Sequence, residues 1–380
     1  LFEKKNQIND LEQVIKQAKK NCKPDARIDY FLSLFYFRKK KYSYSNSIIN
    51  KNKLEKKLLK YNNYFSNLLD LKFKNLEKLK LFKKAFETVK QKNIFVSNLK
   101  ENKKYDKKQF FKTIETYKNF YLKNQINPTS YDKHPNIAFI VGFPRSGTTL
   151  LDTILRTHSK TLVLEEKPYL LNLRHEFFKQ KNNKLESINE INKDEIQIIQ
   201  KKYLENINYN NNKIIIDKFP LTIMEIGFVK KIFPKSKIIL SMRHPCDTVL
   251  SCYFSNFKIN EAMINFLDIK DSVNFYNKIF ELFDIYNSSL NLKFLTVKYE
   301  DLVVSFDKTL NEILNFLNLK YEKKLNRFYE TARNRNIINT PSYSQVTQPL
   351  YKSSIGRWKN YEDVSFLKKD LKKWIEKFEY

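Results

Sequence analysis

Glycine, proline and cysteine are scarce in this sequence, and the first two shortages exclude whole classes of protein. Only 4 of the 380 residues are glycine and 10 are proline, which excludes collagen-like and loop-dominated chains. Hydrophobic residues make up 42% of the chain and aromatic residues 15%, which is too apolar for a disordered protein. We therefore expect a globular protein with a well-packed core, long enough for two or three domains.

Signals for membrane insertion and export are missing. No apolar run reaches the roughly 18 residues that a membrane-spanning helix needs, and residues 1–10 lack the order of a signal peptide. The three cysteines (Cys22, Cys246 and Cys252) cannot all pair, and none lies in a CxxC motif. Free thiols in a reducing compartment are expected, so the sequence predicts a cytoplasmic protein. Residue 1 is Leu and not Met, which leaves the natural start of the chain open.

Motifs for metal binding and for hydrolysis are missing as well. The four histidines (His134, His158, His175 and His244) form no HExxH motif, and no paired cysteines accompany them. No GxSxG sequence is present, which argues against a serine hydrolase. We expect chemistry without a metal ion.

The chain carries a large excess of positive charge. It has 71 Lys and Arg against 41 Asp and Glu, a formal net charge of +30. In the first third of the chain the basic residues are nearly all lysines, scattered among asparagines and aromatic residues. This scatter argues against nucleic-acid binding as the main function.

Two regions with different patterns divide the chain. Residues 1–126 show apolar side chains three and four positions apart, which predicts an all-α segment. Within it, residues 29–61 resemble a degenerate tetratricopeptide repeat, although the small residues usual between its two helices are missing. A helical cap on the following domain is the alternative. Asn127-Pro128-Thr129 marks a break, and a second domain is predicted over residues 131–380.

Short β-rich segments alternate with helical patterns in the second domain. The predicted strands cover residues 136–142, 161–164, 213–217, 237–242 and 294–298. The predicted helices cover residues 149–158, 221–233, 247–257, 264–290 and 306–317. Apolar strands separated by helices indicate a mostly parallel sheet with helices on both faces, so the expected fold class is α/β.

The segment IAFIVGFPRSGTTLL, residues 137–151, carries the strongest functional signal. An apolar strand runs into a glycine and a turn, and a helix follows, which is the geometry of a phosphate-binding loop. Gly147 lets an anion approach the backbone, Arg145 supplies positive charge, and three hydroxyls are neutral donors (Ser146, Thr148 and Thr149). Thr148 stands where a P-loop has its lysine, which disfavours a nucleoside triphosphate.

This loop resembles the 5′-phosphosulfate loop of sulfotransferases, which use 3′-phosphoadenosine-5′-phosphosulfate (PAPS). The resemblance extends over several ordered motifs, from about residue 136 to residue 361. It points to the branch of protein-tyrosine and tetratricopeptide-repeat sulfotransferases. It implies the P-loop-like sulfotransferase fold, PAPS as co-substrate and a hydroxyl group as acceptor.

A second anion site is expected around Arg243 and Ser251. Arg243 ends a predicted strand, and Ser251 lies two turns along the helix that follows, so both side chains can converge on one anion. The resemblance assigns this pair to the 3′-phosphate site. A plain ion pair of Arg243, with Asp247 interacting only with the helix N-terminus, is the alternative.

Two carboxylates and a lysine at strand ends are candidates for the chemistry. Glu165 and Glu166 follow a predicted strand, where a carboxylate suits a general base that takes the proton of a hydroxyl acceptor. By its distance from Arg145, Glu166 matches the family's catalytic glutamate; Glu165 or a solvated acidic turn is the alternative. We expect only one of the two to face the cleft, because successive strand residues point in opposite directions. Lys218 matches the family's lysine that neutralises charge on the sulfonate.

Three further nucleotide contacts are implied by the resemblance. Tyr299, in the segment KYEDL, would approach the nucleotide. Ser342 and Arg357 fall on phosphate-contacting positions of a carboxy-terminal loop, which Trp358 is expected to anchor.

These features predict an enzyme that moves a sulfonate group from PAPS to a hydroxyl acceptor. The resemblance implies protein tyrosine as that acceptor, with carbohydrate, lipid and small-molecule hydroxyls left open. The helical segment is expected to dock the acceptor and to do no chemistry. The rival functions are a P-loop kinase or nucleoside triphosphatase and a non-catalytic helical-repeat scaffold with a degenerate nucleotide domain.

Overall fold

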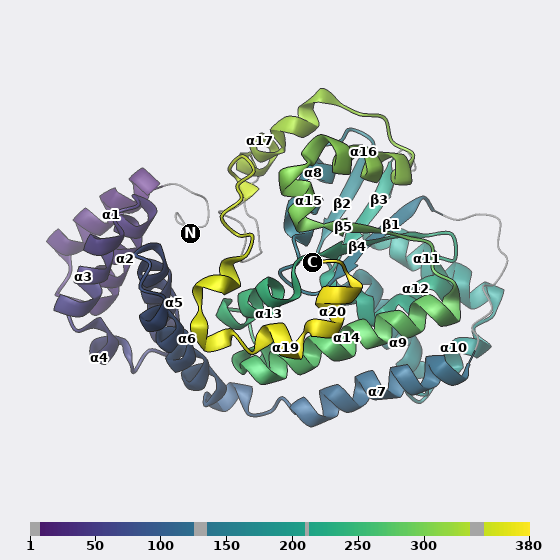
Figure 1. Ribbon diagram of the computed structural model, residues 1–380, viewed down its shortest axis with the longest axis horizontal. Coiled ribbons are helices and arrows are strands. Elements are labelled where there is room, and N and C mark those ends of the chain that lie inside the picture. The colour runs from purple at the N-terminus through teal and green to yellow at the C-terminus, as the bar shows by residue number, and fades with distance from the viewer. Residues whose placement is uncertain (1–7, 125–134, 210–212, 335–345) are drawn as a thin grey trace.

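Five parallel strands form the sheet at the centre of the protein (Figure 1). The computed structural model describes residues 8–124, 135–209, 213–334 and 346–380. Within these ranges the strands lie in the order β2-β3-β1-β4-β5. Their bounds are Ile137–Gly142 (β1), Thr161–Glu165 (β2), Ile214–Lys218 (β3), Lys237–Met242 (β4) and Phe294–Lys298 (β5). Each predicted strand is confirmed to within one residue at either end, and so is the α/β fold class.

Helices cover both faces of the sheet because both faces are apolar. Along β1, Ile137, Phe139 and Val141 pack into one core, and Ala138 and Ile140 into the other. The first core includes α7 (Lys107–Lys123), α9 (Tyr169–Gln180), α11 (Lys193–Asn206), α12 (Ile226–Ile232), α13 (Pro245–Phe254) and α14 (Ile269–Leu290). The second includes α8 (Thr148–Arg156), α15 (Tyr299–Val304), α16 (Phe306–Leu317) and α17 (Phe328–Arg333).

Two of the predicted helices are each divided in the structure. The helix predicted over 221–233 begins as a 3₁₀ segment, η2 (Pro220–Glu225), before α12. The helix predicted over 264–290 is split into η3 (Met263–Leu267) and α14. The Asp268 carboxylate accepts hydrogen bonds from the N–H groups of Lys270 and Asp271, at 2.8 and 3.0 Å, so this residue starts a new helix.

The amino-terminal part is helical, as predicted. It contains α1 (Ile8–Asn21), α2 (Ala26–Arg38), α3 (Tyr42–Lys51), α4 (Leu54–Leu58), α5 (Asn62–Lys78) and α6 (Phe82–Ser97) before α7. Helices α2 and α3 pack together through two buried serines. Ser33 Oγ donates to Ser45 O at 2.9 Å, and Ser45 Oγ donates to Ser33 O at 2.8 Å. Small residues therefore do lie between these two helices, although the sequence pattern indicated that the usual ones are missing. The tetratricopeptide assignment stays a prediction.

The last helices of the amino-terminal part share the main core of the α/β part. Ala85 and Val89 of α6 and Ile114 of α7 are fully buried in the same cluster as Phe139 of β1. Helix α7 runs alongside α14 in Figure 1. One core thus contains residues from both sides of the predicted domain boundary between residues 126 and 131. The boundary itself stays a prediction.

The shortage of glycine shows in the helix ends. The chain takes left-handed backbone angles after α2 at Lys40 (φ 59°), after α5 at Lys80 (φ 60°) and after α16 at Asn318 (φ 58°). Glycine is the usual residue at such positions because it has no Cβ. Two of the four glycines instead lie at 142 and 147, in the predicted anion loop.

Membrane spans, disulfides and grouped metal ligands are absent from the described residues. No helix in these ranges combines the length and apolar character that crossing a membrane requires. The cysteines are free thiols, with Cys22 exposed and Cys246 and Cys252 buried. No three His, Cys, Asp or Glu side chains of the described ranges lie together as a metal site.

Asp217 is a buried carboxyl group whose ionisation should weaken the fold. Burial raises its pKa to about 7, although Tyr203, which donates a 2.6 Å hydrogen bond to it, and Lys218 act in the opposite direction. A pKa higher in the folded than in the unfolded chain means that this group costs stability as pH rises from about 4 to about 7.

The Asp217→Asn variant should therefore be more stable than the wild type at pH 8, by ~2–4 kcal/mol, and nearly equal to it at pH 4. The amide keeps an oxygen acceptor for Tyr203 but cannot ionise. Urea unfolding at several pH values measures the difference between the two proteins. A difference that does not change with pH would contradict this account of Asp217.

Candidate active site

The loop between β1 and α8 brings glycines and hydroxyls to the carboxyl edge of the sheet. Gly142 has φ 152°, and a Cβ there would lie 2.4 Å from Ser241 O, so only glycine fits. Gly147 has φ 97°, and a Cβ there would meet the Tyr299 ring at 3.0 Å. Gly147 also precedes α8 without a side-chain cap, which leaves the first N–H groups of this helix suited to an anion.

The hydroxyl groups of this loop are buried, and one has no partner. Ser146 is 2% exposed, and its Oγ makes no hydrogen bond within the described residues. Thr148 and Thr149 are also buried at the start of α8. A buried hydroxyl without a partner is costly unless a ligand uses it, so Ser146 fits an anion contact.

Arg145 reaches across the loop to Ser251. Its Nε donates to Ser251 Oγ at 3.1 Å, and its backbone has the left-handed φ of 70°. Burial lowers the pKa of Arg145 to about 10; the positive charges of Arg243 and Arg357 act in the same direction, and Cys252 opposes them. Three like-charged guanidinium groups near one another indicate a site for an anion.

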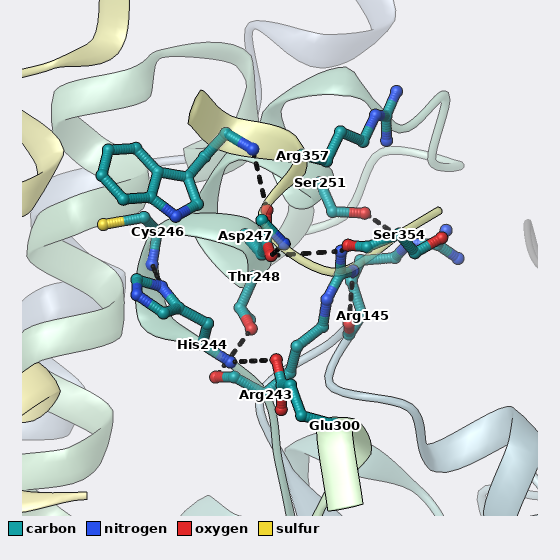
Figure 2. A network of polar contacts seen from close by, with 12 residues as sticks. Arg145, Arg243, His244, Cys246, Asp247, Thr248, Ser251, Glu300, Ser354 and Arg357 are labelled. Atoms are coloured by element: carbon teal, nitrogen blue, oxygen red, sulfur yellow. Dashed lines mark hydrogen bonds and ion pairs between the residues drawn. The ribbon is translucent and has the colours of Figure 1, made fainter. Parts of the chain in front are cut away.

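Arg243 lies just after β4 and contacts the loop from the other side. Its Nη2 donates to Ser354 O at 2.5 Å, and its Nη1 lies 3.5 Å from Arg145 O (Figure 2). Its guanidinium stands 5.3 Å from the centre of the Tyr299 ring. Arg243 is 6% exposed, and its Nε has no hydrogen-bond partner in the described part of the chain. Arg243 and Ser251 thus both contact Arg145, Arg243 through the Arg145 carbonyl and Ser251 through the Arg145 Nε.

Asp247 fixes the carboxy-terminal loop, a role that the sequence did not suggest. One carboxylate oxygen accepts from the Gly356 N–H at 2.7 Å and the other from the Trp358 N–H at 2.9 Å (Figure 2). Asp247 is 1% exposed, and its Oδ2 lies 3.8 Å from the Nη2 of Arg243. The Trp358 ring stacks on His244 with centroids 5.6 Å apart, which fits the expected anchor. No local sequence signal connects Asp247 with a loop 109 residues away.

Arg357 lies in this loop with its guanidinium turned toward the amino-terminal helices. Its Nε donates to Glu77 Oε1 of α5, and the guanidinium lies 5.1 Å from the centre of the Phe254 ring. Figure 2 shows it pointing away from Arg243. Ser342, the other predicted phosphate contact of this region, lies outside the described residues.

Lys218 is the centre of a second cluster, at the ends of β2 and β3. It is fully buried, and its Nζ lies 2.7 Å from Glu166 Oε1, 3.9 Å from Glu165 Oε1 and 3.7 Å from Asp152 Oδ2. Asp152 stands on α8, one turn after the anion loop. The same helix therefore connects the loop with the lysine and its carboxylates.

Both glutamates approach Lys218, whereas strand alternation would turn one of them away from it; that only one faces the cleft stays a prediction. Strand β2 ends at Glu165, and Glu166 takes the left-handed φ of 49° while its N–H donates to Lys218 O at 2.8 Å. This turn interrupts the alternation on which the expectation depended. The two still differ in access, because the Glu166 side chain is 40% exposed and that of Glu165 is 10% exposed.

Tyr299 packs between the anion loop and Arg243. Burial raises the pKa of its hydroxyl to about 12, with Tyr351 adding to the increase and Arg243 opposing it. Apart from Arg357, which pairs with Glu77 of α5, the described sequence-predicted site residues form two neighbouring groups at one sheet edge, where ligands of parallel α/β proteins bind.

Residues 135–323 match the family model described as the sulfotransferase family. This part of the chain is similar to the sulfotransferase family. The resemblance inferred from the motifs is thereby confirmed for the region that contains the anion loop, Glu166, Lys218, Arg243 and Ser251.

Curated relatives of this chain are about a quarter identical to it over the aligned residues. An uncharacterized protein of Aquifex aeolicus (strain VF5) is 26% identical over 301 residues, 76% of this chain and 39% of the relative. Protein-tyrosine sulfotransferase 1 of Danio rerio is 26% identical over 248 residues, 62% of this chain and 69% of the relative. Protein-tyrosine sulfotransferase A of Caenorhabditis elegans is 25% identical over 238 residues, 60% of this chain and 62% of the relative. The chain spans less than two thirds of the first and third of these proteins.

Among solved structures, the sulfotransferase domain of the Synechococcus PCC 7002 olefin synthase is similar to this chain. The alignment covers 68% of this chain and 99% of that domain, with 21% identity and a TM-score of 0.45.

Proposed function

We propose that this protein transfers a sulfonate group from PAPS to a hydroxyl acceptor. The observation that carries the proposal is the buried Lys218, 2.7 Å from Glu166. This pair adjoins an anion loop that has Thr148 in place of the P-loop lysine. The pair offers a cation for developing negative charge and a base for a proton. A kinase or triphosphatase would lack its phosphate-binding lysine here.

The transfer moves one sulfonate group and one proton. The acceptor oxygen attacks the sulfur of PAPS, and its proton passes to the Glu166 carboxylate. The bond between sulfur and the bridging phosphate oxygen breaks, which leaves adenosine 3′,5′-bisphosphate. Lys218 and Arg145 offset the negative charge that grows on the leaving phosphate.

The two phosphates of the nucleotide would occupy different parts of the site. The loop residues Arg145, Ser146, Gly147, Thr148 and Thr149 hold the 5′-phosphosulfate. Arg243 and Ser251 hold the 3′-phosphate, with Tyr299, Arg357 and Ser342 as further contacts. The unpartnered Ser146 Oγ and Arg243 Nε support this division, because each is a buried donor without a protein acceptor among the described residues.

Protein tyrosine is the acceptor that we propose. Relatives that are named protein-tyrosine sulfotransferases support this choice. The helical part, residues 1–126, would dock the acceptor protein. Its free cysteine, like the two in the α/β part, supports a reducing compartment such as the cytoplasm.

Thermal unfolding with different nucleotides tests the proposed donor. Adenosine 3′,5′-bisphosphate at about 100 times its Kd should raise the melting temperature by ~3 °C, because it binds only the folded chain. ATP at the same concentration should raise it much less. A larger increase with ATP would favour the kinase or triphosphatase alternative, and no increase with either would favour the non-catalytic scaffold.

Arg243→Ala should weaken binding of adenosine 3′,5′-bisphosphate about 10- to 100-fold, the effect of ~1.5–3 kcal/mol for a charged hydrogen bond. Binding of AMP, which has no 3′-phosphate, should change little. Isothermal calorimetry with both nucleotides measures this. Arg327→Ala is the matched control, because this exposed arginine forms an ion pair with Glu330 at the surface. Equal losses for the two nucleotides would overturn the assignment of Arg243 to the 3′-phosphate.

A further inference from the structure

Helices α5 and α6 of the amino-terminal part pack against the helix that carries Ser251. Lys92 Nζ of α6 donates to Phe254 O at 3.0 Å, and Asn93 Nδ2 donates to Tyr253 O at 3.0 Å. These two carbonyls belong to the last turn of α13, where backbone oxygens lack helical partners. Lys92 and Asn93 are each 1% exposed. The amino-terminal helices thus complete the end of α13.

Glu77, at the end of α5, contacts the carboxy-terminal loop at two places. Its Oε1 accepts hydrogen bonds from Arg357 Nε and, at 2.8 Å, from Tyr361 Oη. The Glu77 side chain is 18% exposed and that of Arg357 is 23% exposed. Burial opposes the charge of Arg357, but Glu77 outweighs burial and raises the pKa of Arg357.

The loop from Gly356 to Tyr361 is therefore held from two sides. Asp247 of α13 accepts hydrogen bonds from the N–H groups of Gly356 and Trp358, and Glu77 of α5 holds Arg357 and Tyr361. Glu77 Oε1 accepts its hydrogen bond from the Nε of Arg357. A guanidinium group has five N–H donors, so this contact leaves Arg357 further donors with which to bind a ligand.

We propose that Glu77 is a positioning residue for the nucleotide site, which holds Arg357 and its loop in the conformation that receives a phosphate. The inference rests on the proposed function. It makes the amino-terminal helices part of the nucleotide site as well as the docking segment for an acceptor. Ordering a long arginine side chain before the ligand arrives reduces the entropy lost on binding.

A double-mutant cycle tests whether Glu77 acts through Arg357. Glu77→Gln keeps the size of the side chain but loses its charge, and we expect binding of adenosine 3′,5′-bisphosphate to weaken about 5- to 20-fold. In the Arg357→Ala background the same substitution should change the affinity less than about twofold. If Glu77 has only a structural role, Glu77→Gln should weaken nucleotide binding by the same factor in the wild type and in the Arg357→Ala background.

The matched control is Glu281→Gln, because Glu281 of α14 pairs with Lys118 of α7 at 2.7 Å. That substitution also removes an ion pair between the amino-terminal helices and the α/β part. The affinity for adenosine 3′,5′-bisphosphate should nevertheless stay the same. Tyr361→Phe removes the second contact of Glu77 and gives a further variant if Glu77→Gln unfolds. Circular dichroism checks the folding of each protein.

The outcomes separate this inference from the proposed function. If the wild type does not bind adenosine 3′,5′-bisphosphate, the proposed function fails. If the wild type binds and Glu77→Gln binds equally well, Glu77 has no positioning role. Tighter binding by Glu77→Gln would mean that Glu77 competes with the phosphate for Arg357, which also overturns the inference.

Discussion

Glu166→Gln should lower kcat by about 10² to 10⁴ while affinity for adenosine 3′,5′-bisphosphate stays the same. The amide cannot take the proton of the acceptor, although it can still accept a hydrogen bond from Lys218, which lies 2.7 Å from Glu166 in the wild type. The 40% exposure of Glu166 lets an acceptor reach it. The measurement is the rate at which labelled sulfonate is transferred from PAPS. This rate is divided by the number of nucleotide-binding sites, which calorimetry counts.

Glu165→Gln is the control for this variant, with the same chemical change one residue away. We expect a loss of less than about tenfold, because Glu165 is 10% exposed and its Oε1 lies 3.9 Å from Lys218 Nζ. If Glu165→Gln is the more damaging substitution, the base is Glu165 and the assignment of Glu166 is wrong.

Lys218→Met should lower kcat by about 10² to 10³ per folded, nucleotide-binding molecule. The variant keeps the length of the side chain but has no charge to offset that of the leaving phosphate. Transfer of labelled sulfonate from PAPS, per nucleotide-binding site, measures this loss.

The matched control is Lys231→Met, which changes another buried lysine, 6% exposed and located on α12. It should leave the rate per binding site as it is in the wild type. If Lys218→Met has wild-type turnover per binding site, Lys218 has only a structural role in this cluster.

The strands and the anion loop were predictable because their signals are local. Each strand is a short apolar run, and β1 leads directly into the glycines and hydroxyls of residues 142–149. The region between β2 and β3 was not assigned, although α11 begins with a readable signal. The side chain of Asn192 caps the Glu195 N–H and that of Glu195 caps the Asn192 N–H, a capping box that spans four residues.

Contacts between distant residues were not predictable from patterns. Glu77 and Arg357 are 280 residues apart, and the sequence gives no reason to pair them. The backbone of Glu166 is a second example, because its φ of 49° is unusual for a glutamate and moves the side chain out of the strand alternation. Both features depend on the assembled fold and not on local preference.

The central claim is that this chain transfers sulfonate from PAPS with Glu166 as the base. The most direct test incubates the wild type and Glu166→Gln with sulfur-labelled PAPS and a panel of tyrosine peptides, saccharides and aryl alcohols. γ-labelled ATP serves as the alternative donor. The account predicts labelled sulfate ester on at least one hydroxyl acceptor with the wild type, at least 10²-fold less with Glu166→Gln, and no label from ATP. Equal labelling by both proteins, or transfer from ATP instead of PAPS, would contradict it.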